Sequence, residues 1–175
     1  SGEEDIVVGE EYFLGKVVEY DKNGKEVIRF PRLTILGENA EGTIKIKDGN
    51  GQIRDVSKDV LEDYQLGKVS DTLNNKKAKF FMENVNTIFE FNFGKGEKKR
   101  GRLEYSHKDK VLNFVYRNKF GKISKIEVTG DQFVPRKGFN NPMISAVGQL
   151  TVAQKTSLEE FTKEKDERVK AKRGN

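Results

Sequence analysis

Basic side chains gather in the middle of the chain, where their chemistry would be the binding of phosphate groups. Residues 76–150 contain 16 Lys and Arg against 7 Asp and Glu, whereas residues 1–75 contain 10 against 16. Such a surface attracts a nucleic-acid backbone through counterion release, and tyrosines beside it can stack on bases. The residues expected to bind are Lys98, Lys99, Arg100, Arg102, Tyr105, Tyr116, Arg117, Lys119, Lys122, Lys125, Arg136 and Lys137.

The leading hypothesis is therefore a non-enzymatic protein that associates with DNA or RNA through a basic β surface and with little sequence specificity. The alternative is a structural or protein-protein interaction module, inside or outside the cytoplasm, whose acidic first half docks a basic partner or attracts the second half. A third interpretation is that these cations bind no ligand. Lysines also keep exposed strands soluble and block pairing at strand edges.

Groups suited to covalent or acid-base catalysis are scarce. The chain has no cysteine, and its single histidine, His107, lies in a predicted turn beside Lys108. A general base needs a positioned partner, and zinc sites favour clusters of His and Cys. We expect no enzymatic activity, no cofactor and no metal site. A metal-dependent nuclease would need Glu90, Glu97 and Lys99 to converge in the fold.

Two glycine-containing segments resemble ligand loops only in part. Residues 48–53 have the oxygen-bearing residues of a calcium loop, but that register places Ile46 and Ser57 where carboxylates are required. Residues 94–96 join two predicted strands, so no helix N-terminus is available there to face a phosphate. Both segments are interpreted as hairpin turns.

The basic residues are expected on an antiparallel meander of four strands. Phe89, Phe91 and Phe93 alternate within the first strand and predict one buried face. The connections between the strands are short, and this is typical of antiparallel neighbours. The predicted strands are Thr87 to Phe93, Lys98 to Tyr105, Val111 to Arg117 and Lys122 to Val128.

The acidic half is expected to form two hairpins and a short helix. The first hairpin combines Glu11 to Tyr20 with Val27 to Phe30, and the second combines Thr43 to Lys47 with Gln52 to Val56. The two hairpins share one design and are expected to pair. Ser57 predicts the N-cap of a helix that Gly67 ends.

A charged helix is expected at the C-terminal end of the sequence. Thr156 and Glu159 fit a capping box, and the following residues form ion pairs at i,i+4 spacing. Its apolar face is only Leu158, Phe161 and Val169, so the helix should dock lightly or project from the body. Residues 129–140 are expected to be a loop, and Asn141-Pro142 begins a short helical or extended segment.

Together these elements predict a mainly β fold, small-barrel or sandwich-like, with antiparallel hairpins, a four-stranded meander, one short internal helix and a charged C-terminal helix. The expected subdomains are residues 1–72, 76–150 and 156–173, either separate or within one compact domain. No run of about 18 apolar residues is present that would span a membrane. The first residues lack the pattern of a signal peptide, which predicts a cytoplasmic or nucleoid-associated protein unless a leader has been removed.

Overall fold

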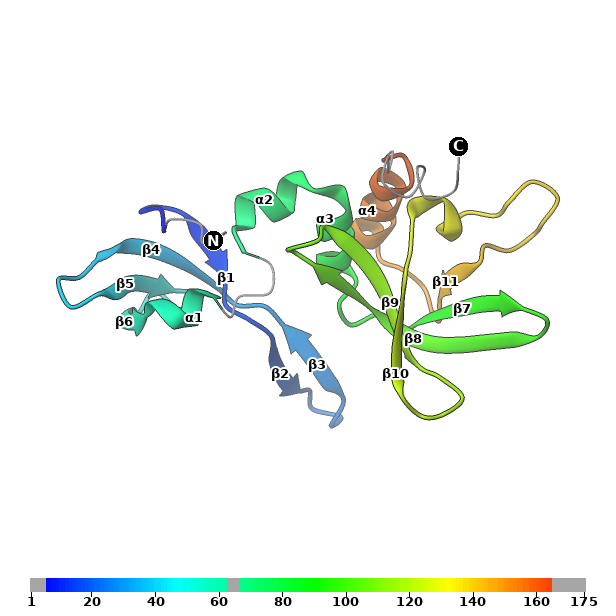
Figure 1. Cartoon of the computed structure of the whole chain (residues 1–175), viewed down its shortest axis with the longest axis horizontal. Coiled ribbons are helices and arrows are strands. Elements are labelled where there is room, and N and C mark those ends of the chain that lie inside the picture. The colour runs from blue at the N-terminus through cyan, green and yellow to red at the C-terminus, as the bar shows by residue number, and fades with distance from the viewer. Residues whose placement is uncertain (1–5, 63–66, 165–175) are drawn as a thin grey trace. The chain divides into compact units, whose positions relative to one another are not determined.

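A computed structural model describes residues 6–62 and 67–164, and Figure 1 shows its helices and strands. The chain divides into two compact units, residues 1–74 (unit 1) and residues 75–175 (unit 2). Both units are built on antiparallel sheets, so the mainly β fold expected from the sequence is confirmed. Within the two described ranges, no helix is both long and apolar enough to cross a membrane.

Unit 1 contains a four-stranded sheet with the order β1-β4-β5-β6. Its strands are β1 (Glu11–Phe13), β4 (Arg32–Glu38), β5 (Thr43–Asp48) and β6 (Ile53–Ser57). The second predicted hairpin is confirmed as β5 and β6. Strand β4, which pairs with both β1 and β5, was not predicted.

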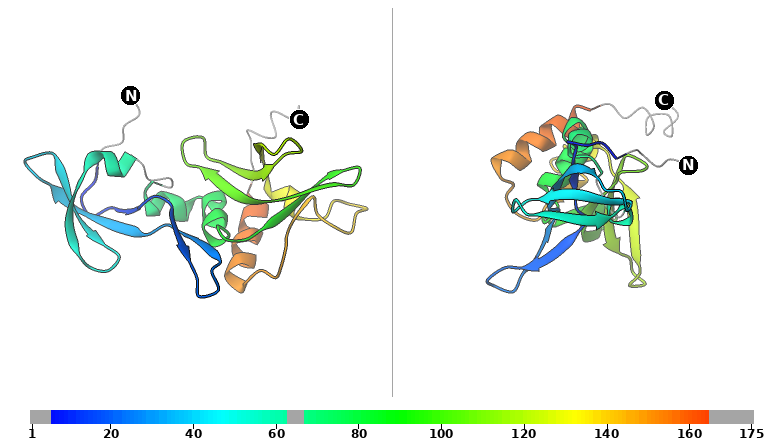
Figure 2. Two further views of the ribbon diagram at one scale, coloured as in Figure 1. Left: turned by 90° about the horizontal axis from the view of Figure 1, so that it is seen from below. Right: turned by 90° about the vertical axis from the view of Figure 1, so that its left-hand side faces the viewer.

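The first predicted hairpin forms a separate two-stranded sheet of β2 (Val17–Tyr20) and β3 (Glu26–Arg29). The expectation that the two hairpins pair is wrong, because β4 takes the position beside β5. The predicted strand from Glu11 to Tyr20 is also broken in two. Between its parts, the backbone N–H of Leu14 donates to the carbonyl of Pro31, which turns the chain from one sheet into the other. Figure 2 shows this hairpin projecting away from the larger sheet.

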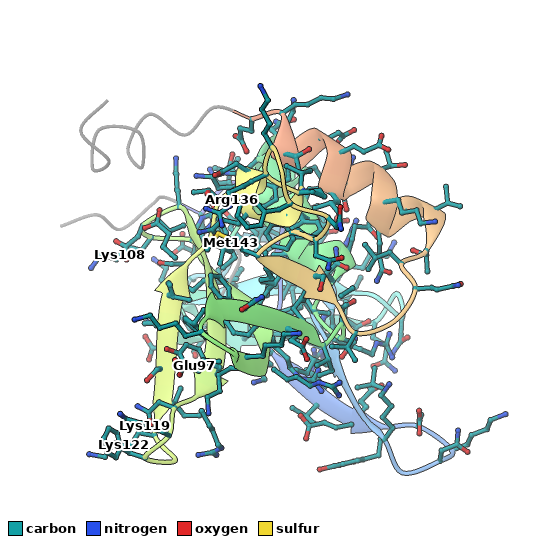
Figure 3. All side chains as sticks on the ribbon, turned by 90° about the vertical axis from the view of Figure 1, so that its right-hand side faces the viewer. Glu97, Lys108, Lys119, Lys122, Arg136 and Met143 are labelled. Carbon is teal, nitrogen blue, oxygen red and sulfur yellow. The ribbon has the colours of Figure 1, made fainter. Side chains whose placement is uncertain are left out.

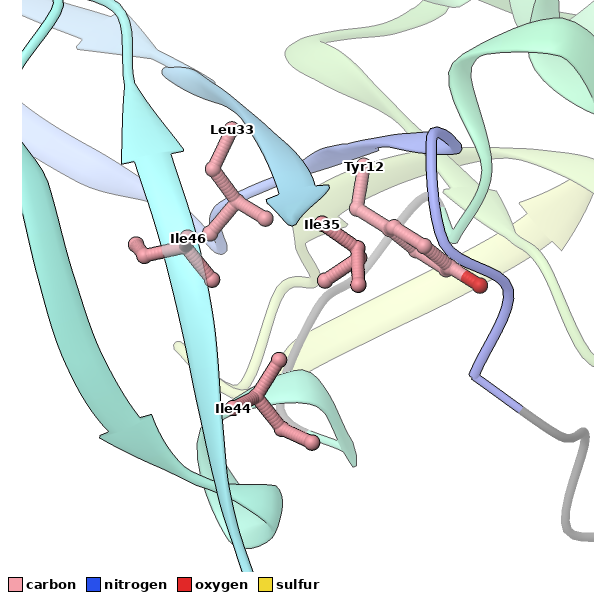
Figure 4. Packing of buried hydrophobic residues seen from close by; sticks show 5 residues of the cluster. All are labelled: Tyr12, Leu33, Ile35, Ile44 and Ile46. Atoms are coloured by element: carbon pink, nitrogen blue, oxygen red, sulfur yellow. The ribbon is translucent and has the colours of Figure 1, made fainter. Parts of the chain in front are cut away.

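The core of unit 1 follows from alternation along β4 and β5. Leu33 and Ile35 face inward from β4, and Ile44 and Ile46 face inward from β5, each at most 2% exposed. Tyr12 completes the cluster from β1 (Figure 4). Helix α1 (Lys58–Glu62) begins directly after Ser57 as expected, and α2 (Val69–Asn74) follows the part of the chain at residues 63–66 that lies outside the description.

Unit 2 contains a five-stranded antiparallel sheet with the order β10-β9-β8-β7-β11. The predicted meander is confirmed by three consecutive pairings, and β11 adds a short fifth strand beside β7. The strands are β7 (Phe89–Gly94), β8 (Glu97–Ser106), β9 (Val111–Arg117), β10 (Ile123–Glu127) and β11 (Ile144–Ala146).

Helices cover one face of this sheet. Helix α3 (Lys76–Glu83) was not predicted, although Asn75 caps it by accepting from the backbone N–H groups of Lys77 and Ala78. A 3-10 turn, η1 (Gly130–Phe133), lies in the segment expected to be a loop. The ring of Phe80 packs 5.2 Å from Phe133 and 6.2 Å from Phe89, measured between centroids.

The last described helix, α4 (Val152–Thr162), differs from its prediction in both start and packing. Its capping box uses Thr151 and Gln154, five residues earlier than expected, and Thr156 lies inside the helix. Phe161 is 1% exposed and stacks on Phe80 at 5.3 Å, so the helix is firmly docked. Val169 and the expected ion pairs that involve residues after 164 lie outside the described residues.

Candidate nucleic-acid interface

The strand register of unit 2 brings five basic side chains to one face of the sheet. Arg102 lies opposite Val115, and Val115 lies opposite Lys125, so these three residues share a face. Alternation along each strand adds the remaining members. We call this surface the basic face; its cations are Lys98, Arg100, Arg102, Arg117 and Lys125.

The opposite surface, which we call the aromatic face, carries the core. Phe89, Phe91, Leu103 and Phe114 point from it and are at most 4% exposed. Helix α3 packs against β8 and β9 on this side, and η1 and α4 close the cluster around Phe80. The helices occupy the aromatic face, so within unit 2 they leave the basic face uncovered.

Four of the five cations on the basic face have no ion pair within the described ranges, although Glu90, Glu104 and Glu127 lie on the same face. Arg100 is the exception, because its Nε lies 3.4 Å from Glu90 Oε2 on the neighbouring strand. Arg117 donates from Nη1 to the carbonyl of Gly121 at 2.9 Å, a contact that leaves its charge intact. Lys98 and Lys125 are exposed, and neither has an ion pair within the described ranges.

Arg102 is the least exposed cation of the basic face. It is half-buried, and its Nη1 finds no hydrogen-bond acceptor in the described part of the chain. This nitrogen is itself buried, so a ligand cannot reach it without a rearrangement, and a buried guanidinium N–H without an acceptor is costly.

Charge is distributed unevenly along the basic face. Glu104 lies opposite Asn113, and Asn113 lies opposite Glu127, so two carboxylates sit together at one end of the face. The cations lie toward the other end, where the β7-β8 and β9-β10 turns are found. Positive charge is therefore concentrated at the end of the sheet that carries these two turns.

Three of the expected binding residues on the strands point away from the basic face. Lys99 pairs with Phe91 and Tyr116 pairs with Gly101, so both point to the aromatic side. Tyr116 is half-buried, with Phe93 and Phe114 at 5.3 and 5.6 Å between ring centroids. Tyr105 is only 6% exposed. The expectation that the two tyrosines offer stacking surfaces beside the arginines is wrong, because alternation places them on the opposite side.

The hydroxyl of Tyr105 lies in a buried polar cluster. It accepts a hydrogen bond from Asn75 Nδ2 at 3.0 Å. Burial, with a smaller contribution from the negative charge of Glu164, raises the pKa of Tyr105 from 10.0 to about 12. The folded protein therefore holds this phenol neutral over a pH range in which an unfolded chain ionises it.

This shift predicts a loss of stability at alkaline pH. Below pH 10 the phenol is protonated in both states, but between pH 10 and 12 only the unfolded chain releases the proton, so unfolding becomes easier. Each unit of pKa shift corresponds to about 1.4 kcal/mol, so the contribution is on the order of 2 kcal/mol. Urea unfolding of wild type and Tyr105→Phe at pH 9 and 11.5 measures this contribution to the free energy of unfolding.

The Tyr105→Phe protein should lose less stability than wild type over this pH interval. Tyr20→Phe, at a position that is 70% exposed, is the matched control. If wild type and Tyr105→Phe lose the same stability between the two pH values, Tyr105 does not titrate as stated.

The remaining four expected residues lie in two connections. Lys119 and Lys122 belong to the turn between β9 and β10, and Arg136 and Lys137 belong to the loop between η1 and β11. Figure 3 shows Arg136 at the opposite end of the view from Lys119 and Lys122. These two basic turns therefore lie apart on unit 2.

Two exposed phenylalanines beside these cations were not predicted to be functional. Phe120 is 74% exposed and Phe139 is 60% exposed. Lys119 Nζ lies 5.3 Å from the centroid of the Phe120 ring, and Arg136 Cζ lies 4.7 Å from that of Phe139. The available signal in the sequence was an aromatic residue within a polar turn, where no core exists to bury it.

The nuclease interpretation fails on geometry. Glu90 lies opposite Arg100 and Phe91 lies opposite Lys99, so Glu90 and Lys99 point to different faces of the sheet. The convergence that this mechanism requires is absent. Within residues 6–62 and 67–164, no group of three or more His, Cys, Asp or Glu side chains could hold a metal ion.

Comparison of the chain with protein-family models, with curated proteins and with solved structures found no match.

Proposed function

We propose that unit 2 binds nucleic acid through its basic face, that it contacts the phosphate backbone with little sequence preference, and that it performs no chemistry on the ligand. The observation that carries this proposal is the gathering of five cations on the open face of one sheet, with a single carboxylate pairing among the described residues. Charge that is neither buried nor balanced is available to a polyanion.

The spacing of the cations suits a linear array of phosphates. Lys98, Arg100 and Arg102 alternate along β8, so their side chains stand about 6.7 Å apart. Arg117 and Lys125 extend the same surface across β9 and β10. An arginine can donate two parallel hydrogen bonds to one phosphate, and such a contact would fix the position of the backbone.

The basic residues of unit 1 provide a contrast. Four of them form ion pairs with carboxylates of the same unit: Arg29 with Glu19, Arg32 with Glu11, Arg54 with Asp48 and Lys58 with Glu38. Unit 1 has an excess of acidic residues, 16 against 10 basic ones. The nucleic-acid interface is therefore assigned to unit 2 alone.

Fluorescence anisotropy with labelled duplex DNA, single-stranded DNA and RNA tests this function. If the five cations each displace one counterion, affinity should fall between about a hundredfold and five-hundredfold from 50 to 200 mM salt. Absence of binding at 50 mM salt, or affinity that does not depend on salt, would contradict the proposal.

A further inference from the structure

We infer that single-stranded nucleic acid is the ligand of the basic face, and that Phe120 stacks on one of its bases, with Phe139 as a second platform of the same construction. This inference rests on the proposed function, because it names the class of nucleic acid that the same interface takes.

Hydrogen bonds to the backbone order the β9-β10 turn, which carries Phe120 at its tip. The side chain of Asn118 accepts from the backbone N–H groups of Phe120 and Lys122, at 2.9 and 3.1 Å. The backbone N–H of Gly121 donates to the carbonyl of Asn118, and Gly121 adopts a positive φ of 73°. Since the turn is already ordered, a base that stacks on the exposed ring does so at little entropic cost.

The surroundings of the ring favour a single stacked base over insertion into a duplex. Lys119 lies over the Phe120 ring, so the cation and a base would occupy opposite faces of it. A side chain that inserts between two base pairs needs both faces free. One open face matches an unpaired base, such as those that single strands present to aromatic side chains.

The second platform repeats this arrangement. Arg136 lies over the Phe139 ring, and the backbone N–H of Phe139 donates to the carbonyl of Arg136 at 2.9 Å. Gly138 supplies the positive φ of 86° in this turn. Because Arg136 and the β9-β10 turn lie apart in Figure 3, the two rings would contact different nucleotides.

Charge leads from the Phe120 ring onto the basic face. Lys122 is in the same turn, Arg117 and Ile123 form the adjacent strand pair, and Lys125 follows on β10. A strand with one base on Phe120 thus has its phosphates drawn along the sheet. An anionic membrane would also attract lysines beside an exposed Phe, but the cations here extend away from the turn instead of surrounding it.

Substitution of the exposed rings separates stacking from charge. Base stacking on an aromatic side chain is worth about 1–3 kcal/mol, so Phe120→Ala should weaken single-strand binding by roughly 5-fold to 150-fold. The salt dependence should not change, since no cation is removed. Duplex affinity should change less than twofold. Val152→Ala, at an 81% exposed position on α4, is the matched control.

A single-stranded oligonucleotide that contains 2-aminopurine provides a direct readout, because stacking on Phe120 quenches its fluorescence. Wild type should quench it, and Phe120→Ala should quench less. If the rings contact separate nucleotides, the fold loss of affinity in the double variant Phe120→Ala/Phe139→Ala should equal the product of the fold losses in the two single variants.

The possible results are distinguishable. If wild type binds and Phe120→Ala shows the same affinity and the same quenching, the stacking inference is overturned but the proposed function stands. A wild type that prefers duplex DNA over the single strand also overturns it. No binding to any nucleic acid overturns both, and binding only to phosphatidylserine vesicles, lost in Phe120→Ala, would assign the turn to a membrane surface.

Discussion

Reversing Lys98, Arg117 and Lys125 to Glu is expected to abolish nucleic-acid binding at 50 mM salt. These three cations of the basic face were chosen because Arg100 is paired with Glu90 and Arg102 is half-buried. Each lost phosphate contact costs about tenfold at this salt concentration, so three cost roughly a thousandfold before repulsion by the new carboxylates is added. Fluorescence anisotropy measures the affinity.

The control for this prediction places the same charge change on unit 1. Lys22→Glu/Lys25→Glu/Lys47→Glu alters the net charge equally at exposed positions outside the basic face. If this control loses affinity as strongly as the unit 2 variant, long-range attraction by total charge explains binding and the basic face is not the interface. Circular dichroism of both variants shows whether each remains folded.

Gly101→Ala is expected to destabilise unit 2 by about 3 kcal/mol or more, at the upper end of the range for overpacked cores. A Cβ atom on Gly101 would lie 2.1 Å from the carbonyl oxygen of Val115 and 3.0 Å from Phe114 Cζ. Neither contact can be relieved by movement of a flexible side-chain end, because one contacted atom belongs to the backbone and the other to the buried ring of Phe114. Strands β8 and β9 would have to move apart, with loss of ladder hydrogen bonds.

Thermal unfolding followed by circular dichroism measures this effect, which corresponds to a fall in Tm of roughly 10–20 °C for a unit of about 100 residues. Gly148→Ala is the matched control, because its Cβ meets no atom within 4 Å and its backbone has no positive φ. Equal Tm values for Gly101→Ala and Gly148→Ala would show that the two strands do not approach as closely as described.

The meander of unit 2 could be predicted because its signals are local. Period-two alternation and short polar turns determine neighbouring antiparallel strands with little help from distant residues. Strand β11 could not be predicted in the same way, since it pairs with β7 more than 50 residues earlier in the chain. Its three residues carry no pattern of their own.

The helices were harder to predict because tertiary contacts select among competing local signals. Both Thr151 with Gln154 and Thr156 with Glu159 fit a capping box in the sequence. The earlier one is used, and Gln154 Nε2 also donates to the carbonyl of Glu83 and to Thr87 Oγ1. In α3, adjacent phenylalanines at Phe80 and Phe81 obscure the helical period, and the cap at Asn75 was the only clear signal.

The basic face was partly predictable. Alternation along β8 places Lys98, Arg100 and Arg102 on one side, but only the packing of α3 and α4 shows that this side is open. The same alternation already separates Tyr105 from Arg102, so the expected aromatic partners could have been rejected from the sequence. The exposed Phe120 needed no tertiary information beyond the turn that contains it.

The docking of α4 also determines when unit 2 can fold during synthesis. Phe161 completes a core that Phe80 and Phe89 begin, and β11 pairs with β7, so the last contacts join distant parts of the chain. Unit 1, in contrast, is a compact unit that ends at residue 74, before unit 2 begins. On the ribosome, unit 1 can therefore fold early, whereas unit 2 can complete its core only after α4 has left the exit tunnel.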